Sequence, residues 1–414
     1  MSNWLAKRPA VSWALYDWAN SAFATTVMAG FFPTFFRQFW SNGADSTVTT
    51  FRLGMANAVA GLLIALLAPL LGAIADRGGH RKRMLLVFSL LGILATLALF
   101  FVAQGRWVEA AVLFTLGTLG FNGGIVFSDS MLLDVAKPAD YDRTSALAYA
   151  LGYLGGGLLF AVNVAMVVKP AWFGLADAAA AVRWSFVTVA LWWLVFMLPT
   201  LLYVREAAPV SASARAAIAA GWQELLSTAR QVRRIPLLWQ FLLAYWLYID
   251  GVNTIIKMAV DYGMAIGLAS ADLLGALLLT QFVAFPASLA FGWIARRWSA
   301  RTGVMLGLAV YVLLTVWAYF LDTAIEFYLM ATVVGLVQGG VQSLSRSMFG
   351  RLVPPGKSAE YFGFYNMVGK FGTVLGPALM GLVALAAGST RASILALLML
   401  FVPGALLLWR VRVP

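Results

Sequence analysis

Apolar runs long enough to cross a bilayer recur along nearly the whole sequence, and they limit the folds that are open to the chain. Hydrophobic residues make up 62% of the 414 residues and charged residues 11%, whereas soluble domains are about 45–50% apolar and about 25% charged. A membrane-spanning helix needs about 20 mostly apolar residues. The composition therefore excludes an ordinary soluble protein and predicts an all-α membrane protein with many spans.

Charged or Gly- and Pro-rich breaks divide the sequence into expected membrane spans. We place twelve of them, at residues 11–40, 52–75, 84–103, 108–134, 143–168, 183–204, 236–262, 271–295, 303–321, 325–350, 360–386 and 391–410. The longest break, 205–235, separates six spans from six and predicts two six-helix bundles, 1–204 and 236–414. This Ala- and Ser-rich linker with a basic end fits either an amphipathic helix on anionic membrane lipids or a flexible tether.

The positive charges predict which side of the membrane each connection faces. The chain carries 29 Lys and Arg against 17 Asp and Glu, an excess that would suggest nucleic-acid binding in a soluble domain. With a cytoplasmic N-terminus, most of these cations fall in connections that are then also cytoplasmic, as the positive-inside rule requires. We therefore expect both termini in the cytoplasm, a bacterial inner-membrane location and no nucleic-acid partner.

Residue types that many enzymes and metal sites need are scarce. The chain has no cysteine and one histidine, His80, so thiolate metal sites and cysteine nucleophiles are excluded and imidazole chemistry nearly so. The sequence contains no Gly-x-x-x-x-Gly-Lys-Ser/Thr loop, so ATP is not expected to be the direct energy source. We expect no enzyme activity, no cofactor and no metal.

Short motifs repeat in the two expected bundles. Asp17-x-x-Asn20-Ser has a counterpart in Asp250-x-x-Asn253-Thr. At an offset of 217 residues, the frame Ser-Asp129-Ser-Met recurs as Ser-Arg346-Ser-Met, with arginine in place of the acid. Internal repeats of this kind are typical of transporters built from two related halves. The repeats therefore predict pseudo-symmetry between the bundles.

The loop Gly72-Ala-Ile-Ala-Asp76-Arg77-Gly-Gly-His-Arg-Lys82 resembles the loop signature of the major facilitator superfamily. Within that superfamily, residues 16–23 and 363–371 are similar to the subfamily that includes the yeast autophagy-related vacuolar amino-acid effluxer and its bacterial relatives. The resemblance covers all the expected spans. It implies the twelve-helix major facilitator fold, alternating access, export of cargo, and a latch formed by Asp76 and Arg77. The equivalent loop of the second half has Arg296 where the acid is expected. This departure from the signature argues against a second latch in that loop.

Polar groups inside the spans predict a central cavity. An ionisable group at the bilayer centre costs about 2.5–3.5 kcal/mol on insertion scales, so it usually faces a cavity or a partner. Ten residues are candidates for substrate binding or proton coupling: Asp17, Asn20, Tyr153, Asp250, Asn253, Lys257, Gln338, Tyr365, Asn366 and Lys370. The lysines would receive an anionic group and the aspartates an ammonium group or a proton. The alternative is that these groups only neutralise or hydrogen-bond one another between helices.

The exchange of acids for arginines between the halves predicts a cytoplasmic gate. Pseudo-symmetric positions approach each other across the two-fold axis, so Asp129 would pair with Arg346 and Asp134 with Arg351 when the cytoplasmic side is closed. The alternative is local pairing of the acids with Lys137 or Arg143. The basic residues 81–83 are assigned to topology. If the first pair is direct, reversing both of its charges should restore activity that either single reversal abolishes.

Together these features predict a secondary active transporter that moves a small polar or zwitterionic, amino-acid-like metabolite by alternating access. We expect proton-coupled efflux by a monomer in contact with membrane lipids. Two alternatives stay open: a proton-coupled exporter of amphipathic drugs, and a transport-fold receptor that binds without moving cargo.

Overall fold

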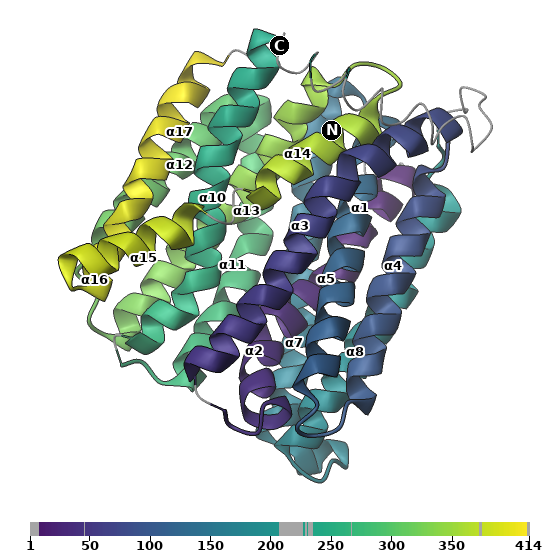
Figure 1. Cartoon of the computed structure of the whole chain (residues 1–414). Helices are drawn as coiled ribbons and strands as arrows, with labels where there is room; N and C mark the ends of the chain where they lie inside the picture. The colour runs from purple at the N-terminus through teal and green to yellow at the C-terminus, as the bar shows by residue number, and fades with distance from the viewer. Residues whose placement is uncertain are drawn as a thin grey trace.

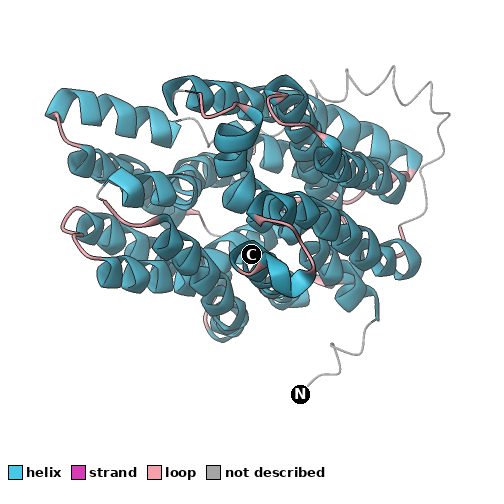
Figure 2. Ribbon diagram, turned by 90° about the horizontal axis from the view of Figure 1, so that it is seen from below, coloured by secondary structure: helices cyan, strands magenta, loops and turns pink. Residues whose placement is uncertain are grey.

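The structure is a computed structural model of the whole chain, and it describes residues 8–44, 46–206, 227, 230, 235–265, 267–371 and 375–411. Within these ranges the regular elements are helices, most of which lie side by side with similar axial directions (Figures 1 and 2). Most of the expected linker 205–235 lies outside the described residues.

The first helices of the chain come from residues 8–206. The α1 helix (Arg8–Ala22) continues through π-helical turns at Phe23–Phe31 and Phe36–Trp40, on either side of the short α2 (Phe32–Phe35). The remaining helices are α3 (Ser46–Gly78), α4 (Arg81–Ala98), α5 (Trp107–Ser130), α6 (Leu132–Val135), α7 (Tyr141–Val168) and α8 (Ala178–Tyr203). We call residues 8–206 the N-terminal part.

The C-terminal part, residues 235–411, holds the later helices. They are α10 (Pro236–Ala265), α11 (Ser270–Arg297), α12 (Ala300–Ala318), α13 (Ala324–Leu352), α14 (Ser358–Phe371), α15 (Leu375–Ala387), α16 (Thr390–Ile394) and α17 (Leu398–Arg410). The described residues of the expected span 360–386 lie in α14 and α15, and residues 372–374 between them are outside the described part of the chain. Figure 1 shows that α1 begins and α17 ends at the same end of the molecule, which we call the termini side.

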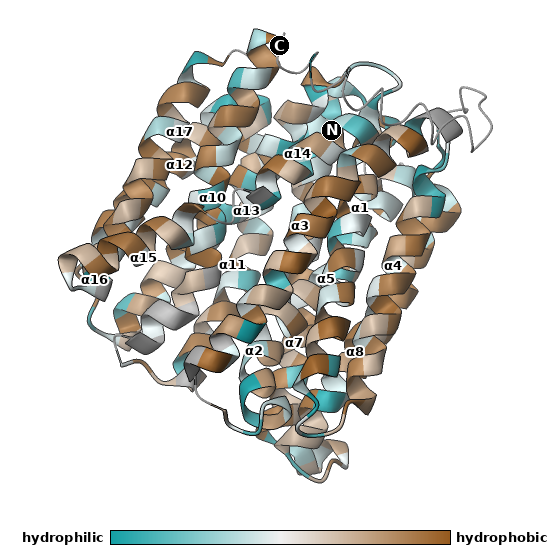
Figure 3. Cartoon of the chain, in the orientation of Figure 1, coloured by the Kyte–Doolittle hydropathy of each residue, from teal (hydrophilic) through white to brown (hydrophobic). Residues whose placement is uncertain are grey.

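Ten helical segments of the described chain are long and apolar enough to cross a membrane. They coincide with ten of the expected spans, and the segments at 11–40 and 236–262 are helical but are not among the ten. Hydrophobic residues cover the lengths of the helices, while hydrophilic residues are frequent at the loops (Figure 3). Large apolar side chains such as Leu66 and Leu313 are exposed on this outer surface, as lipid contact requires. The protein is a multi-pass membrane protein.

Two large hydrophobic clusters fill the interior. One joins buried residues between Trp13 and Val204, and the other joins buried residues between Leu238 and Val411. Ala359, at the start of α14, packs into the first cluster although it belongs to the C-terminal part. Each part thus has its own core, and α14 lies where the two parts meet.

Candidate functional site

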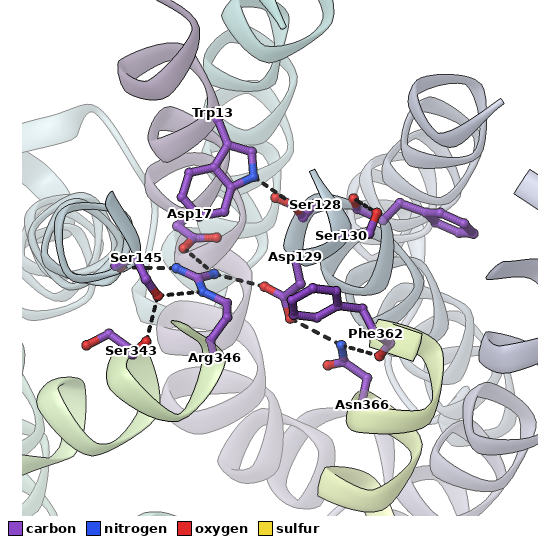
Figure 4. Close-up of polar contacts among 11 residues, drawn as sticks. Trp13, Asp17, Ser128, Asp129, Ser130, Ser145, Ser343, Arg346, Phe362 and Asn366 are labelled. Atoms are coloured by element: carbon purple, nitrogen blue, oxygen red, sulfur yellow. Dashed lines mark hydrogen bonds and ion pairs between the residues drawn. The ribbon is translucent and has the colours of Figure 1, made fainter. Parts of the chain in front are cut away.

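The guanidinium of Arg346, near the end of α13, lies between two carboxylates of the N-terminal part. Its Nη1 is 2.8 Å from Oδ1 of Asp129 on α5 and 3.1 Å from Oδ2 of Asp17 on α1. The Arg346 side chain is 2% exposed. Figure 4 shows the three side chains converging from separate helices. We call Asp17, Asp129 and Arg346 the central triad.

Further contacts hold the Arg346 guanidinium in place. Its Nε donates to Ser145 Oγ at 2.9 Å, and Nη2 donates to the Ser145 carbonyl at 3.1 Å. The rings of Trp13 and Tyr149 flank it, with their centroids 4.8 and 4.4 Å from Cζ, so cation–π attraction adds to the ion pairs. With both carboxylates ionised, the triad would carry one net negative charge in a buried site.

Polar contacts around the triad join the two parts of the chain. Asn366 Nδ2 on α14 donates to Oδ2 of Asp129 at 3.1 Å and to the Phe362 carbonyl at 3.0 Å. Ser145 Oγ donates to the Ser343 carbonyl at 2.7 Å. Asp129 therefore accepts hydrogen bonds from both α13 and α14 through different oxygens, which fixes the orientation of its carboxylate.

A second group of contacts, the α14 tie, lies at the start of α14 and consists of Asp76, Arg81, Asp134 and Ser358. The Asp76 carboxylate at the end of α3 accepts from the backbone N–H groups of residues 359 and 360 at 3.0 and 2.9 Å. Arg81 Nη1 donates to Ser358 Oγ at 2.6 Å and lies 2.9 Å from Oδ2 of Asp134. The tie thus places a carboxylate at a helix N-terminus, where unpaired N–H groups favour negative charge.

A third group, the α13 tie, consists of Asp142, Ser347 and Arg351. The two terminal nitrogens of Arg351 each donate to one Asp142 oxygen at 2.8 Å, which is a bidentate pair. Ser347 Oγ donates to Oδ1 of Asp142 at 2.5 Å, and Arg351 Nη2 also donates to the Pro138 carbonyl at 3.1 Å. This tie joins the end of α13 to the start of α7 through side chains.

The structure forms one of the two ion pairs expected for the gate. Arg346 does contact Asp129, but it also contacts Asp17, which the paired-charge argument did not include. The predicted pairing of Asp134 with Arg351 was wrong, because Asp134 binds Arg81 and Arg351 binds Asp142. Arg81 was assigned to topology, yet it is 5% exposed. A buried guanidinium needs a counter-charge, and the nearest acid is Asp134.

The other expected cavity residues are distributed over several environments. Tyr153 OH donates to Gln342 Oε1 at 2.7 Å. Tyr365 stacks on the rings of Tyr245 and Phe349 at centroid distances of 4.2 and 4.8 Å, so it is packed among aromatic side chains. Asn20 and Gln338 are buried, and Asn253 and Lys370 are half-buried. Asp250 is buried beside α15. The side chains of Lys257 and Arg77 lie outside the described part of the structure.

Sequence reasoning missed Trp13, Ser145, Tyr149 and Asp142. A signal existed for Asp142, which is an acid in the first turn of the span beginning near residue 141. Serine and aromatic residues are common in membrane helices, so their types alone do not indicate a shared role. What brings them to Arg346 is the packing of α7 against α1 and α13.

A family model described as "Vacuole effluxer Atg22 like" matches residues 42–140 and 133–414. The chain belongs to this family. A relative of the Atg22-like chain, the uncharacterized MFS-type transporter YxiO of Bacillus subtilis (strain 168), is 36% identical over 405 residues, covering 96% of this chain and 93% of the relative. Autophagy-related protein 22 of Gibberella zeae is 22% identical and covers 90% of this chain and 70% of the relative.

Solved structures of the major facilitator superfamily share the fold of the Atg22-like chain. The human organic anion transporter MFSD10 (TETRAN) matches with a TM-score of 0.73 at 15% identity, over 99% of this chain and 100% of that one. The proton:xylose symporter XylE matches with a TM-score of 0.76 at 12% identity, over 98% and 95%. The family match and the MFS-type relative, together with this shared fold, identify the protein as an Atg22-like major facilitator and a secondary transporter.

Proposed function

We propose that this Atg22-like protein is a proton-coupled exporter of a small zwitterionic, amino-acid-like metabolite. It would work by alternating access between two six-helix halves, residues 1–204 and 236–414, which together cross the bacterial inner membrane twelve times with both termini in the cytoplasm. The observation that carries this proposal is the central triad, in which one buried guanidinium is shared by two carboxylates of the other part of the chain.

The triad belongs to a state that is closed on the termini side. The central triad, the α14 tie and the α13 tie all involve α14 or the half of α13 nearest that side. If the termini side faces the cytoplasm, the structure is a cytoplasm-closed state, and opening must draw Arg346 away from Asp17 and Asp129. The fold shared with known transporters supports such a movement.

Separation of the triad would create two complementary half-sites. Asp17 and Asp129 would be left together without their cation, and like charges so close together disfavour double ionisation. A proton or an ammonium group would therefore bind there, and the two would compete. Arg346 would be left free to bind a carboxylate. A zwitterion satisfies both half-sites at once, whereas a lipophilic cation satisfies one.

This competition gives a route to coupling. On the cytoplasmic side, the cargo's ammonium group would displace a proton from the aspartates. On closure, Arg346 would return to the carboxylates and displace the ammonium group, so the cargo would leave outward. Uptake of a proton from outside would then complete the exchange of one proton for the cargo's cationic group. The aspartates and Arg346 carry this proposal, and Asn366 orients Asp129.

The test combines binding with flux. The melting temperature of the purified protein would be measured in the presence of amino acids, dipeptides, organic anions, sugars and cationic drugs. A compound that binds the folded state raises this temperature. The compounds that stabilise it would then be tested in proteoliposomes with an imposed proton gradient. We expect zwitterions to stabilise the protein and to move against the proton flux.

Matched variants assign the effect to the triad. Asp17→Asn and Asp129→Asn should abolish proton-driven flux, while Glu109→Gln, which neutralises an acid paired with Arg106 at an exposed helix start, should leave it unchanged. If lipophilic cations alone stabilise the protein, the proposal of a zwitterionic cargo is overturned and a drug exporter is favoured. Binding without flux in any gradient would favour a receptor.

A further inference from the structure

The N-terminal and C-terminal parts of the chain meet closely at two helix junctions. At one junction α3 packs against α14, and a Cβ added at Gly72 would lie 2.3 Å from the carbonyl oxygen of Ala359. At the other, α7 packs against α11. A Cβ added at Gly292 of α11 would lie 2.8 Å from Cβ of Ala146 and 3.7 Å from Cα of Arg143. We call these the α3–α14 junction and the α7–α11 junction.

The repeated loop motif makes the two junctions equivalent, but it places opposite charges in them. Asp76 lies four residues after Gly72, and Arg296 lies four residues after Gly292. At the α3–α14 junction, Asp76 accepts hydrogen bonds from the backbone N–H groups of residues 359 and 360. Residue 360 corresponds to Arg143 at the offset of 217 residues. The α7–α11 junction therefore has an arginine at each of the two equivalent positions.

The charges at the α7–α11 junction oppose the approach of the two parts. The charge of Arg296, from the C-terminal part, repels that of Arg143, from the N-terminal part. Arg297 adds another cation in the last turn of α11. Asp140 attracts Arg143, whereas the carboxylate of Asp142 is bound in the α13 tie. An anion placed between the two parts would turn this repulsion into attraction.

The α7–α11 junction lies where both helices reach the surface of the membrane. The apolar segments that hold these arginines are Pro138–Val168 and Ala271–Arg297, so the arginines lie close to one end of each segment. Trp293 and Trp298 are 61% and 62% exposed, and tryptophan is enriched at the boundary between membrane and water. Arg296 is exposed beside them. Its guanidinium is therefore at the depth of the lipid headgroups.

We propose that the phosphate of an anionic phospholipid binds between Arg143 and Arg296 and holds the α7–α11 junction closed. The lipid supplies the negative charge that Asp76 supplies at the α3–α14 junction. Arginine suits this role because its planar guanidinium donates two parallel hydrogen bonds to a phosphate. Basic pockets between membrane helices bind anionic lipid headgroups in this way. The inference goes beyond the proposed function, since it depends on neither the cargo nor the coupling ion.

The experiment measures closure of the full-length protein in bilayers of two compositions. Because the chain has no cysteine, Tyr203→Cys and Trp409→Cys provide labelling sites without background, at exposed positions near the ends of α8 and α17. The end of α8 lies on the termini side, since Thr200 donates to the Ser12 carbonyl of α1. The distance between two spin labels is measured in nanodiscs of phosphatidylcholine, with and without phosphatidylglycerol.

Three variants of the labelled protein are compared with the labelled parent. Arg296→Gln removes one of the two cations of the proposed site, and Arg296→Glu places an acid there. Arg410→Gln is the matched control, because it removes an exposed arginine at the membrane end of α17, a helix that packs against α10 and α12. All three substitutions are at exposed positions, where folding tolerates a change of side chain.

We expect phosphatidylglycerol to raise the population with the short, closed distance in the parent and in Arg410→Gln. Arg296→Gln should lose this response, because one of the two guanidinium groups that bind the phosphate is gone. In Arg296→Glu the new carboxylate pairs with Arg143 directly. The short distance should then predominate in phosphatidylcholine alone, and phosphatidylglycerol should add nothing.

The proposal is overturned if the parent has the same distance distribution in both bilayers. It is also overturned if Arg296→Gln keeps the full response to phosphatidylglycerol, or if Arg410→Gln loses as much of it. Either result would assign the effect to the overall surface charge. If inorganic phosphate added to phosphatidylcholine nanodiscs produces the same shift, the ligand is a soluble anion and the assignment to a lipid is wrong.

Discussion

The α14 tie and the α13 tie join the same two parts of the chain, but different kinds of atoms hold them. In the α14 tie, Asp76 accepts hydrogen bonds from two backbone N–H groups, and Arg81 lies between Asp134 and Ser358. In the α13 tie, Arg351 and Ser347 bind the single carboxylate of Asp142. One tie uses a helix start, whereas the other uses side chains.

The difference follows from how the sequence repeats. The loop after the second expected span has Asp76, and its counterpart in the second half has Arg296, so an acid is available to bind a helix start in one half only. The second half instead supplies Arg351 on α13, which binds Asp142 in the first turn of α7. The two ties therefore differ in burial and in how strongly they depend on side-chain charge.

The largest expected effect follows from removing the buried cation of the α14 tie. In Arg81→Ala, Asp134 and Asp76 lose a guanidinium whose side chain is 7% exposed, and breaking a buried pair this way costs about 3–5 kcal/mol. We expect a marked fall in melting temperature and weaker closure on the termini side. Arg83→Ala, at an exposed position two residues away, is the control. Equal effects of the two substitutions would show that Arg81 acts through net charge alone.

A smaller effect is expected from the α13 tie. In Arg351→Lys the charge stays but the bidentate geometry is lost, and a hydrogen bond to a charged group contributes about 1.5–3 kcal/mol. The side chains of Arg351 and Asp142 are 16% and 12% exposed, so we expect a value toward the lower end. Thermal melting of Arg351→Lys beside Arg351→Ala measures it. If lysine restores full stability, the pairing geometry does not matter.

Ser347→Ala should have a still smaller effect. It removes one donor to Asp142, whose oxygens keep both nitrogens of Arg351, and a typical hydrogen bond contributes about 0.5–1.5 kcal/mol. Melting of Ser347→Ala in the parent and in Arg351→Ala tests whether the two donors act together. We expect the serine to matter more when Arg351 is absent, because Asp142 would then have lost its cation. Strictly additive losses would contradict this coupling.

The sequence predicted the membrane helices well because hydrophobicity is a local property. Ten expected spans coincide with helices suited to crossing a membrane. The contact between Asp250 and the backbone N–H of Gly376 was not predicted, since the two residues lie 126 positions apart in sequence.

The candidate site was predicted less completely, because helix packing decides which partners meet. The offset of 217 residues correctly brought Asp129 to Arg346, since pseudo-symmetry places equivalent positions near the axis. The same offset wrongly predicted a pair between Asp134 and Arg351. Asp134 pairs with Arg81 and Arg351 pairs with Asp142, and neither pair follows the repeat. Because Arg346 also binds Asp17, reversing the charges of Asp129 and Arg346 together would put two acids face to face, so we now expect no rescue.

The smallest effect, and the sharpest contrast between the ties, should come from salt. At 1 M ionic strength the screening length is about 3 Å, so partly exposed charge pairs weaken while buried ones are affected much less. In Arg81→Ala, closure depends more on the partly exposed α13 tie and should therefore weaken as salt rises. In Arg351→Ala, closure depends on the buried α14 tie, with its backbone donors, and should change little. Spin labels on the exposed residues 137 and 355 would report the distance between the N-terminal part and the C-terminal part. This distance would be measured in both variants over a salt series. Equal salt dependence would contradict the distinction between a tie to a helix start and a tie between side chains.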